Sequence, residues 1–251
     1  MQSAEVTKLV DIPRPDLNTV FLFDIDGTLN EPHQPVGDLI QQKLQSLARH
    51  WHVYFVTGNS YVKSVDTING PQSMYSGIFC HNADELRTMR GKLIWQDTET
   101  PPLPPHIDNQ LMTMLVGQNN HYCNRLEWRS PRMVNYCEIG RFAPAHARAK
   151  HDTGWRPCAA RFLSEKFPEI EVSVGGTYSI DIYSKGADKA RACKYFNERG
   201  KKIIFVGDRT DVSGNDYAVK KYCDEHDENI CFTSTGVSNT LEILDGMLRS
   251  Y

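Results

Sequence analysis

Short apolar runs alternate with amphipathic stretches over the first part of the chain. The apolar runs lie at 19–23 (TVFLF), within 50–60 (HWHVYFVTGNS) and within 75–84 (YSGIFCHNAD), and they predict buried strands. Between them, the stretches VGDLIQQKLQSLARH and SYVKSVDTI carry apolar residues at helical spacing. This β-α-β-α-β order predicts a parallel sheet with helices on both faces.

A proline-rich stretch at 98–108 (TETPPLPPHID) interrupts this alternation and predicts a linker or domain boundary. Beyond it, strands come as adjacent pairs joined by the short turns SPR and GT. Such pairing favours an antiparallel sheet with helices on one face and the other face open. The predicted helices lie at 107–118 and within 144–167, and the predicted strands at 121–129, 133–139, 170–175 and 178–183.

The alternating pattern returns from Ala187 onward. A helix (KARACKYFNERG), a strand ending in aspartate (KKIIFVGD), a helix (NDYAVKKYC), a short strand (ICFTST) and a last helix (SNTLEILDGML) follow one another. We therefore predict an α/β fold with a Rossmann-like parallel-sheet core formed by residues 1–89 and 187–251. An α+β cap domain with an antiparallel sheet, residues 90–186, would be inserted into this core.

The composition narrows the classes of function. The formal net charge of −3 lacks the basic surplus of proteins that bind nucleic-acid backbones, so we expect no nucleic-acid partner. No apolar run reaches the roughly 20 residues that cross a bilayer, and the N-terminus does not have the layout of a secretory signal. The seven cysteines are scattered without a C-x-x-C motif, which favours free thiols. These features predict a cytoplasmic protein without a membrane partner.

Polar residues directly follow three of the predicted core strands. Asp24 and Asp26 follow the first, the TGN sequence at 57–59 follows the second, and Asp208 follows a later one. Ligands of open parallel sheets bind beyond the carboxyl ends of the strands, so these side chains are expected to meet. Two carboxylates this close resist joint ionisation unless a cation neutralises them or they share a proton, and a third acid could complete an oxygen-lined Mg²⁺ site. A D-x-D-G-T stretch alone is also consistent with an aspartate-capped turn, but the combination favours function.

These strand-end sequences resemble the motifs of the haloacid dehalogenase superfamily: DIDGT, VTGN, a downstream lysine and GDRTDVSGND. The resemblance implies that Asp24 attacks phosphorus to form an aspartyl-phosphate, while Asp26 protonates the leaving group and then acts as a base. Asp24, Asp26 and Asp208 would ligate Mg²⁺. Lys189 fits the lysine motif better than Lys185, and its charge would offset that of the phosphoryl group. The phosphoryl oxygens would be bound by Thr57, Gly58 and Asn59.

Within this superfamily, the predicted cap resembles that of the eukaryotic-type phosphomannomutases. EWR, EIGR and a later arginine occur in the order of the three arginines with which that family clamps phosphate, which implies this role for Arg129, Arg141 and Arg148. The segment VGGTYSIDIY resembles the one whose serine and aspartate contact the sugar, here Ser179 and Asp181. In such an enzyme, one phosphate would sit at the nucleophile while the cap arginines hold the other.

The residues themselves support a binding face on the cap. In SIDIY the two isoleucines would pack on helices, while Ser179, Asp181 and Tyr183 would face the open side. Guanidinium groups suit phosphate oxygens, although the basic run around Arg148 is also typical of a solvated helix face. Asn82, in CHNAD, resembles the family's asparagine at the hinge into the cap.

Several positions depart from the family pattern. His33 stands where the family has an arginine, in the loop NEPHQPV, which puts substrate choice in doubt. Thr57 stands where the mutases have glycine, and Tyr222 stands where a second cation loop would have an aspartate. Asp211 and Asp216 either support the metal or cap a turn, and the sequence leaves both readings open.

We therefore expect a Mg²⁺-dependent phosphoryl-transfer enzyme that acts on a small phosphorylated sugar. The first hypothesis is a phosphomannomutase-like phosphohexomutase that moves phosphate between C1 and C6 through a bisphosphate. The alternative is a phosphatase of a small sugar phosphate or a nucleotide, and a third hypothesis is an inactive sensor of a sugar phosphate. The family resemblance also implies a homodimer formed through the cap.

Overall fold

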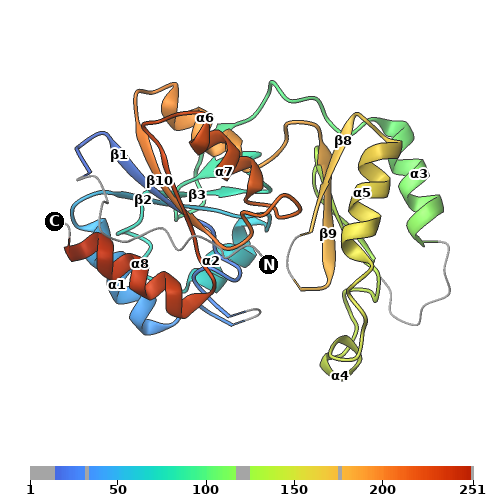
Figure 1. The fold of residues 1–251 in the computed structure, drawn as a ribbon, viewed down its shortest axis with the longest axis horizontal. Helices are drawn as coiled ribbons and strands as arrows, with labels where there is room; N and C mark the ends of the chain where they lie inside the picture. Colours follow the sequence, from blue (N-terminus) through green and yellow to red (C-terminus); the bar gives the residue numbers. More distant parts are fainter. Residues whose placement is uncertain (1–14, 32–33, 117–124, 175–176, 250–251) are drawn as a thin grey trace, which may run out of the picture.

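Two sheets lie next to each other, each with its own helices (Figure 1). The computed structural model describes residues 15–31, 34–116, 125–174 and 177–249, and the statements below concern these residues. We call the part with the larger sheet the core and the part with the smaller sheet the cap. The fold class predicted from the sequence, an α/β core with an inserted antiparallel cap, is confirmed.

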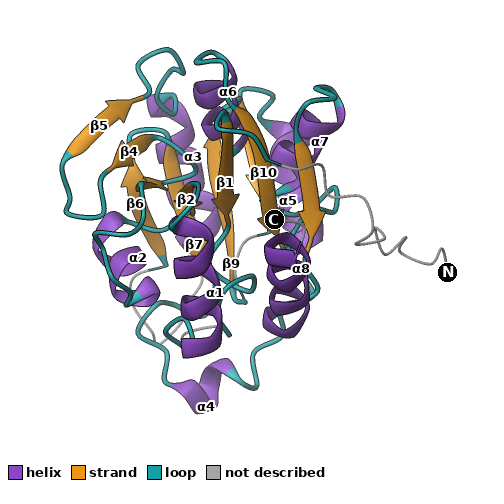
Figure 2. Cartoon of the chain, turned by 90° about the vertical axis from the view of Figure 1, so that its left-hand side faces the viewer, coloured by secondary structure: helices purple, strands orange, loops and turns teal. Residues whose placement is uncertain are grey.

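The core sheet has seven strands in the order β11-β10-β1-β2-β3-β4-β5. The first five in this order are parallel, while β4 and β5 add an antiparallel hairpin. Seen from the side of the core, β5 lies at the outer edge of this sheet (Figure 2). The strands are β1 (Thr19–Phe23), β2 (His52–Val56), β3 (Gly77–Cys80), β4 (Glu85–Arg87), β5 (Leu93–Gln96), β10 (Lys202–Gly207) and β11 (Ile230–Thr233).

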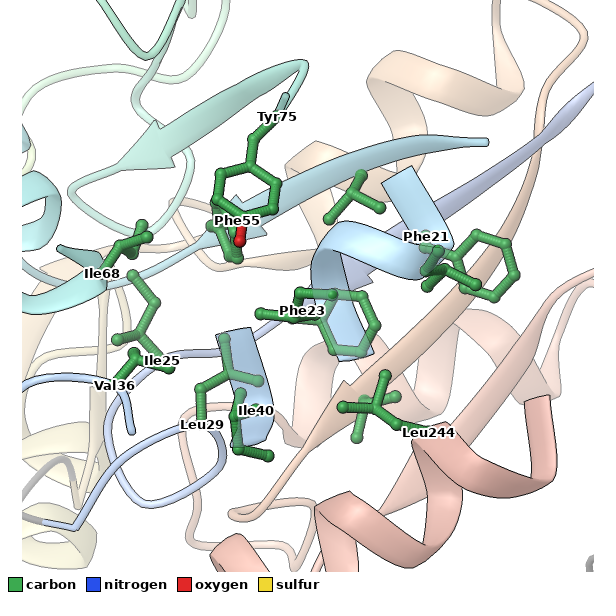
Figure 3. Close-up of a cluster of buried hydrophobic side chains, with 14 of the residues drawn as sticks. Phe21, Phe23, Ile25, Leu29, Val36, Ile40, Phe55, Ile68, Tyr75 and Leu244 are labelled. Atoms are coloured by element: carbon green, nitrogen blue, oxygen red, sulfur yellow. The ribbon is translucent and has the colours of Figure 1, made fainter. Parts of the chain in front are cut away.

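Helices cover both faces of the core sheet, which explains why its central strands read as continuous apolar runs. Along β1, Phe21 and Phe23 point to one face and Val20 and Leu22 to the other, and all four are buried. Figure 3 shows the first face, where Phe21 and Phe23 lie among side chains of α1 and α8. The helices on this face are α1 (Asp38–Ala48), α2 (Tyr61–Ile68) and α8 (Val237–Arg249), and those on the other are α6 (Ala190–Asn197) and α7 (Tyr217–Asp224).

The cap sheet has four antiparallel strands in the order β6-β7-β9-β8. Its strands are β6 (Leu126–Ser130), β7 (Met133–Cys137), β8 (Ile170–Ser173) and β9 (Ser179–Ser184). Helices α3 (Pro105–Val116) and α5 (Arg156–Lys166) pack on one face, where Ile180 and Ile182 of β9 are fully buried. The short helix α4 (Ala145–Arg148) lies at one end of the cap (Figure 1). The opposite face of the sheet carries polar side chains toward the core.

Some elements differ from the prediction. The helix expected within 144–167 is two helices, α4 and α5, because Pro157 lacks a backbone N–H and is tolerated only in the first turn of a helix. The hairpin β4–β5 was not predicted, since its strands are short and β5 is largely exposed. The division of the chain at residues 90 and 186 stays a prediction, although β5, within the predicted cap, pairs in the core sheet. Part of the expected strand 121–129 and of the GT turn lies outside the described residues.

Candidate active site

The polar ends of three neighbouring strands meet at one edge of the core sheet. β1 lies between β2 and β10 and is parallel to both, so the carboxyl ends of the three strands point the same way. The backbone N–H of Asp24 donates to the carbonyl of Val206, and that of Thr57 donates to Phe79, which continues the ladder past the strands. Asp24, Thr57 and Asp208 are thereby brought to one place, as the sequence predicted.

Three carboxylates and one ammonium group form the buried centre of this edge. The ligand oxygens of Asp24, Asp208 and Asp216 lie within 4.8 Å of one another. Lys189, which is fully buried, donates to Asp24 Oδ1 at 2.6 Å and to Asp216 Oδ1 at 2.7 Å. The carboxylate group therefore carries more negative charge than the single lysine balances.

Burial and this surplus negative charge shift the pKa values of the clustered side chains. Burial raises the pKa of Asp24 well above its ordinary value, and Lys189 counteracts only part of that shift. Burial, with the charge of Asp216, raises the pKa of Asp208 to about 6. Burial alone would lower the pKa of Lys189, but Asp216 and Asp24 raise it, so the lysine stays charged. Such a site favours a bound cation that neutralises the carboxylates.

Two local features fit a divalent cation at these acids. A Cβ atom at Gly27 would lie 2.6 Å from Asp208 Oδ2, so this carboxylate approaches the backbone closely, and Gly27 has the positive φ of +88° that glycine favours. Asn215 Oδ1 lines the same cavity, is buried, and has no hydrogen-bond partner among the described residues. Carboxylate and amide oxygens are the ligands that hard divalent cations prefer.

Asp26 lies apart from this carboxylate group, although the sequence analysis placed it among the metal ligands. Its Oδ2 accepts from Asn59 Nδ2 at 2.5 Å, and Asn59 Oδ1 accepts from Lys63 Nζ at 2.9 Å. Because the lysine can only donate, it fixes the amide of Asn59 with its NH₂ group toward Asp26. Asp26 is thus held by a hydrogen bond at the cavity wall, which suits a proton-transfer group.

Gly58 lies where the cap meets the core. Arg129 Nη1 donates to the carbonyl of Gly58 at 2.7 Å. A Cβ atom at Gly58 would lie 3.2 Å from Asn82 Oδ1 and 3.4 Å from both Arg129 Nη1 and Asp181 Oδ2. The loop after β2 therefore leaves little free space beside residue 58 once the cap is docked.

The open face of the cap sheet presents Ser179 and Asp181 to the cavity, as predicted. Asn135 of β7, which no sequence motif indicated, donates through Nδ2 to Asp181 Oδ1 at 2.5 Å and to Ser179 Oγ at 3.1 Å. The alternation in MVNYC could have found it, because Val134 and Tyr136 pack on the helices and the residue between them must face the other way.

The three predicted clamp arginines all line the cavity, and each already has protein partners. Arg129 lies 3.2 Å and Arg141 2.8 Å from Glu127 Oε2, and Arg141 also donates to Asn135 Oδ1. Arg148 donates to the carbonyls of Ala143 and Arg141, and its guanidinium lies 5.6 Å from the centre of the Tyr178 ring. Burial lowers the pKa of Arg141, and the charge of Arg129 adds to this effect.

The described residues enclose a cavity of about 410 Å³ between core and cap, within the size range of small-molecule sites. The lining also includes residues that the sequence motifs did not indicate, among them Lys63, Asn135, Arg156 and Arg209. Asn135 and Arg156 belong to the cap and reach the cavity only through its docking on the core, which no local pattern reveals. His33 lies outside the described residues.

Comparisons with known proteins place the chain in a family. The family model of eukaryotic phosphomannomutase matches residues 40–250. The chain belongs to the eukaryotic phosphomannomutase family. It is similar to the phosphomannomutase of Oryza sativa subsp. indica, with 29% identity over 247 residues that cover 91% of this chain and 95% of that protein. It is also similar to the phosphomannomutase of Saccharomyces cerevisiae, with 27% identity over 216 residues, 80% of this chain and 84% of that protein.

Solved structures agree on the fold. A haloacid dehalogenase-like hydrolase from Bacteroides thetaiotaomicron matches with a TM-score of 0.56 and 11% identity, covering 93% of this chain and 99% of that one. The predicted resemblance to the eukaryotic phosphomannomutases is thus confirmed, and with it a phosphomutase-type enzyme, while the fold matches that of a haloacid dehalogenase-like hydrolase. Family and fold together imply a divalent metal ion, which the group formed by Asp24, Asp208 and Asp216 fits.

Proposed function

We propose that this member of the eukaryotic phosphomannomutase family is a Mg²⁺-dependent phosphohexomutase that interconverts the 1- and 6-phosphates of a hexose. The observation that carries the proposal is the two-sided cavity. Asp24 and Asp26 lie on its core side, and Arg129, Arg141 and Arg148 lie on its cap side. A ligand with a phosphate at each end would contact both sides, whereas hydrolysis of a monophosphate needs no second cluster of cations.

The proposed mechanism follows from the residues around Asp24. An oxygen of Asp24 would form a bond to phosphorus while the bond between phosphorus and the sugar oxygen breaks, and Asp26 would give its proton to that oxygen. Lys189 holds Asp24 in place and offsets part of its charge. A bound Mg²⁺ would add the positive charge that the carboxylates and the phosphoryl group require. When the ligand is the bisphosphate, this half-reaction leaves a hexose monophosphate. In the other half, Asp26 would take a proton from the free hydroxyl of a hexose monophosphate as that oxygen attacks the aspartyl-phosphate, which forms the bisphosphate and frees Asp24.

The polar groups of the cavity wall would position the substrate during these steps. The TGN sequence at 57–59 would bind the phosphoryl oxygens, while Ser179 and Asp181 would bind sugar hydroxyls. The docked cap would keep water away from the aspartyl-phosphate, because water would otherwise hydrolyse this intermediate.

A phosphatase of a small sugar phosphate or a nucleotide is the second candidate. Thr57 favours it, because the VTGN sequence is closer to the phosphatase form of this motif than to the mutase form. The fold itself also occurs in an IMP-nucleotidase of Plasmodium falciparum, at a TM-score of 0.64 and 11% identity over 92% of this chain and 67% of that chain.

A substrate screen separates the two candidates. The protein is incubated with Mg²⁺ and a panel of hexose 1-phosphates, with and without a hexose 1,6-bisphosphate, and both free phosphate and isomer are measured. A mutase forms the 6-phosphate and is stimulated by the bisphosphate. Release of phosphate without any isomer would reject the mutase in favour of the phosphatase.

The proposal also covers the compartment, the substrate class and the oligomeric state of the protein. We place it in the cytoplasm, acting on a small phosphorylated sugar, and its homodimer through the cap stays a prediction. Among the helices in the described part of the chain, none combines the length and apolar character of a membrane-spanning segment.

A further inference from the structure

A chain of two hydrogen bonds joins Lys63 of α2 to Asp26, which the proposed function makes the proton donor. Lys63 Nζ donates to Asn59 Oδ1 at 2.9 Å, and Asn59 Nδ2 donates to Asp26 Oδ2 at 2.5 Å. All three residues line the cavity between core and cap. The proposed function places Asn59 among the phosphoryl-binding residues, but it gives Lys63 no role.

The backbones of Asp26 and Asn59 are held in tight turns at the ends of two neighbouring strands. After β1, the N–H of Gly27 donates to the carbonyl of Asn30 at 3.1 Å, and after β2 the carbonyl of Asn59 accepts from the N–H of His81 at 3.1 Å. Rotation of the two side chains is therefore the freedom that remains at Asp26 and Asn59. The hydrogen bonds of these side chains decide how they are oriented.

The amide of Asn59 has two ends with opposite hydrogen-bonding character, and a rotation of about 180° exchanges them. With its NH₂ end toward Asp26, the amide supports the acid and the carboxylate alike, because both offer an oxygen that accepts. With its oxygen toward Asp26, the amide would accept the proton of the acid and divert it from the sugar oxygen. The orientation of Asn59 therefore decides where the proton of Asp26 goes.

Lys63 selects the first of these two orientations. Its ammonium group can only donate, so it binds the oxygen of the Asn59 amide and leaves the NH₂ end to Asp26. The two residues are four positions apart, about one helical turn, so the start of α2 carries the lysine back over the loop after β2. Since Asp26 Oδ2 accepts from Asn59, Oδ1 is the oxygen that presents the proton to the substrate.

We propose that Lys63 is a positioning residue for proton transfer, which holds the amide of Asn59 so that Asp26 gives its proton to the sugar oxygen. The proton moves from Asp26 Oδ1 to that oxygen as its bond to phosphorus breaks and the bond between phosphorus and Asp24 forms. The sugar leaves as an alcohol, and Asp26 becomes a carboxylate. This inference rests on the proposed phosphoryl transfer to Asp24, and it applies to a mutase and a phosphatase alike because both break the same bond.

The test compares two phosphate esters whose leaving groups differ in their need for a proton. The sugar oxygen of hexose 1,6-bisphosphate leaves readily only when it takes up a proton, whereas 2,4-dinitrophenyl phosphate releases a stable anion. Single-turnover mixing with excess protein and Mg²⁺ measures the cleavage rate of each ester. Lys63→Met should lower the saturating rate by at least about tenfold for the bisphosphate and by less than about twofold for the aryl ester.

Two further variants serve as controls. Lys63→Arg keeps a group that donates to the amide oxygen and should recover most of the rate. Lys194→Met removes a lysine that forms an exposed ion pair with Glu99, and it should leave both rates unchanged. Equal losses on the two esters in Lys63→Met would overturn the positioning role. Weaker bisphosphate binding with an unchanged saturating rate would overturn it as well, because Lys63 would then contact the ligand directly.

A double-mutant cycle shows whether Lys63 acts through Asn59. In an Asn59→Ala background, Lys63→Met should cause less than about a twofold further loss, because the two changes then remove the same chain of hydrogen bonds. The same loss as in the wild-type background would refute this chain. Release of phosphate without any isomer would reject the mutase, while a difference between the two esters would still support the role of Lys63. Thermal unfolding checks that each variant folds.

Discussion

At the scale of single residues, the charged side chains of the site form ion pairs with one another in the protein itself. Lys189 is fully buried between Asp24 and Asp216, so it orients the proposed nucleophile and the start of α7 at the same time. The sequence predicted Asp24, Asp208 and Lys189 from motifs, but it left open whether Asp216 supports the metal or caps a turn. The structure places Asp216 in the carboxylate group, where its side chain accepts from Lys189 and from the Arg209 backbone.

The role of Asp24 gives the first prediction. Asp24→Asn removes the nucleophilic charge but keeps the shape of the side chain, so turnover should fall by at least about three orders of magnitude, as is typical of a lost covalent step. The variant should still fold, because it also relieves the repulsion among the three carboxylates. Steady-state kinetics and thermal unfolding measure the two effects. Turnover close to that of wild type would show that another group attacks phosphorus.

At the scale of elements, loops and helix ends place the catalytic groups. The VTGN loop after β2 carries Gly58, which the docked cap approaches closely. Helix α6 begins directly after Lys189, and Asp188 accepts the N–H of Ala190 at 2.7 Å at its first turn. Such positions could be predicted as strand ends and helix starts, because the polar residues follow apolar runs. The sequence could not predict which of these positions touch the cap, because the docking of the cap depends on contacts between segments that are distant along the chain.

Gly58→Ala tests the fit between loop and cap. Since its backbone φ lies outside the left-handed region, the cost comes from crowding against Asn82, whose Oδ1 would lie 3.2 Å from the new Cβ atom. Mild overpacking of this kind costs about 1 kcal/mol, so we expect substrate affinity to fall by about fivefold. Gly37→Ala is the control, because a Cβ atom there would meet nothing within 4 Å. Equal KM values in the two variants would contradict the close approach of cap and loop.

Asp188 at the start of α6 predicts a pH dependence of stability. Burial raises the pKa of Asp188 to about 6, above its ordinary value of 3.8. A raised pKa in the folded state means that the stability from this group is fully present below about pH 4 and is lost as the pH rises through about 6. Asp188→Asn removes the charge and should be more stable than wild type at pH 7, by up to about 3 kcal/mol.

Denaturant unfolding at several pH values measures this difference. The gap between Asp188→Asn and wild type should shrink as the pH falls from 7 toward 4, because the wild-type carboxyl then takes up a proton. A gap that stays constant over this range would show that the carboxyl of Asp188 does not titrate there.

At the scale of the whole molecule, a buried ion network joins the cap to the core. Asp84 Oδ1 accepts from Arg132 of the cap at 3.1 Å and from Arg191 of the core at 3.2 Å. Arg191 also donates to Asp97 Oδ2 at 2.5 Å and to the carbonyl of Asn82 at 2.8 Å. The neighbouring residues 81–83 all have positive φ, a conformation that is rare without glycine. These contacts lie where the chain passes between the two sheets, and they set how the cap sits over Asp24.

Removing Asp84 tests this network. Asp84→Ala leaves two largely buried arginines without a shared carboxylate, so we expect the free energy of unfolding to fall by about 3 kcal/mol. Glu99→Ala is the control, because Glu99 forms an exposed ion pair with Lys194 that should contribute less than about 1 kcal/mol. Denaturant unfolding measures both. A loss in Asp84→Ala no larger than that in Glu99→Ala would show that the network does not stabilise the molecule.

The sequence by itself determined the layers of the fold and the groups at the strand ends. Buried strands and amphipathic helices have different periods, and parallel strands bring their carboxyl ends to one edge, so Asp24, the TGN loop and Asp208 could be placed together without coordinates. Only the tertiary structure decided the partners of the cap arginines and the place of Asn135 opposite Asp181. Those contacts join segments that are distant along the chain, and they form only when one rigid body docks on another.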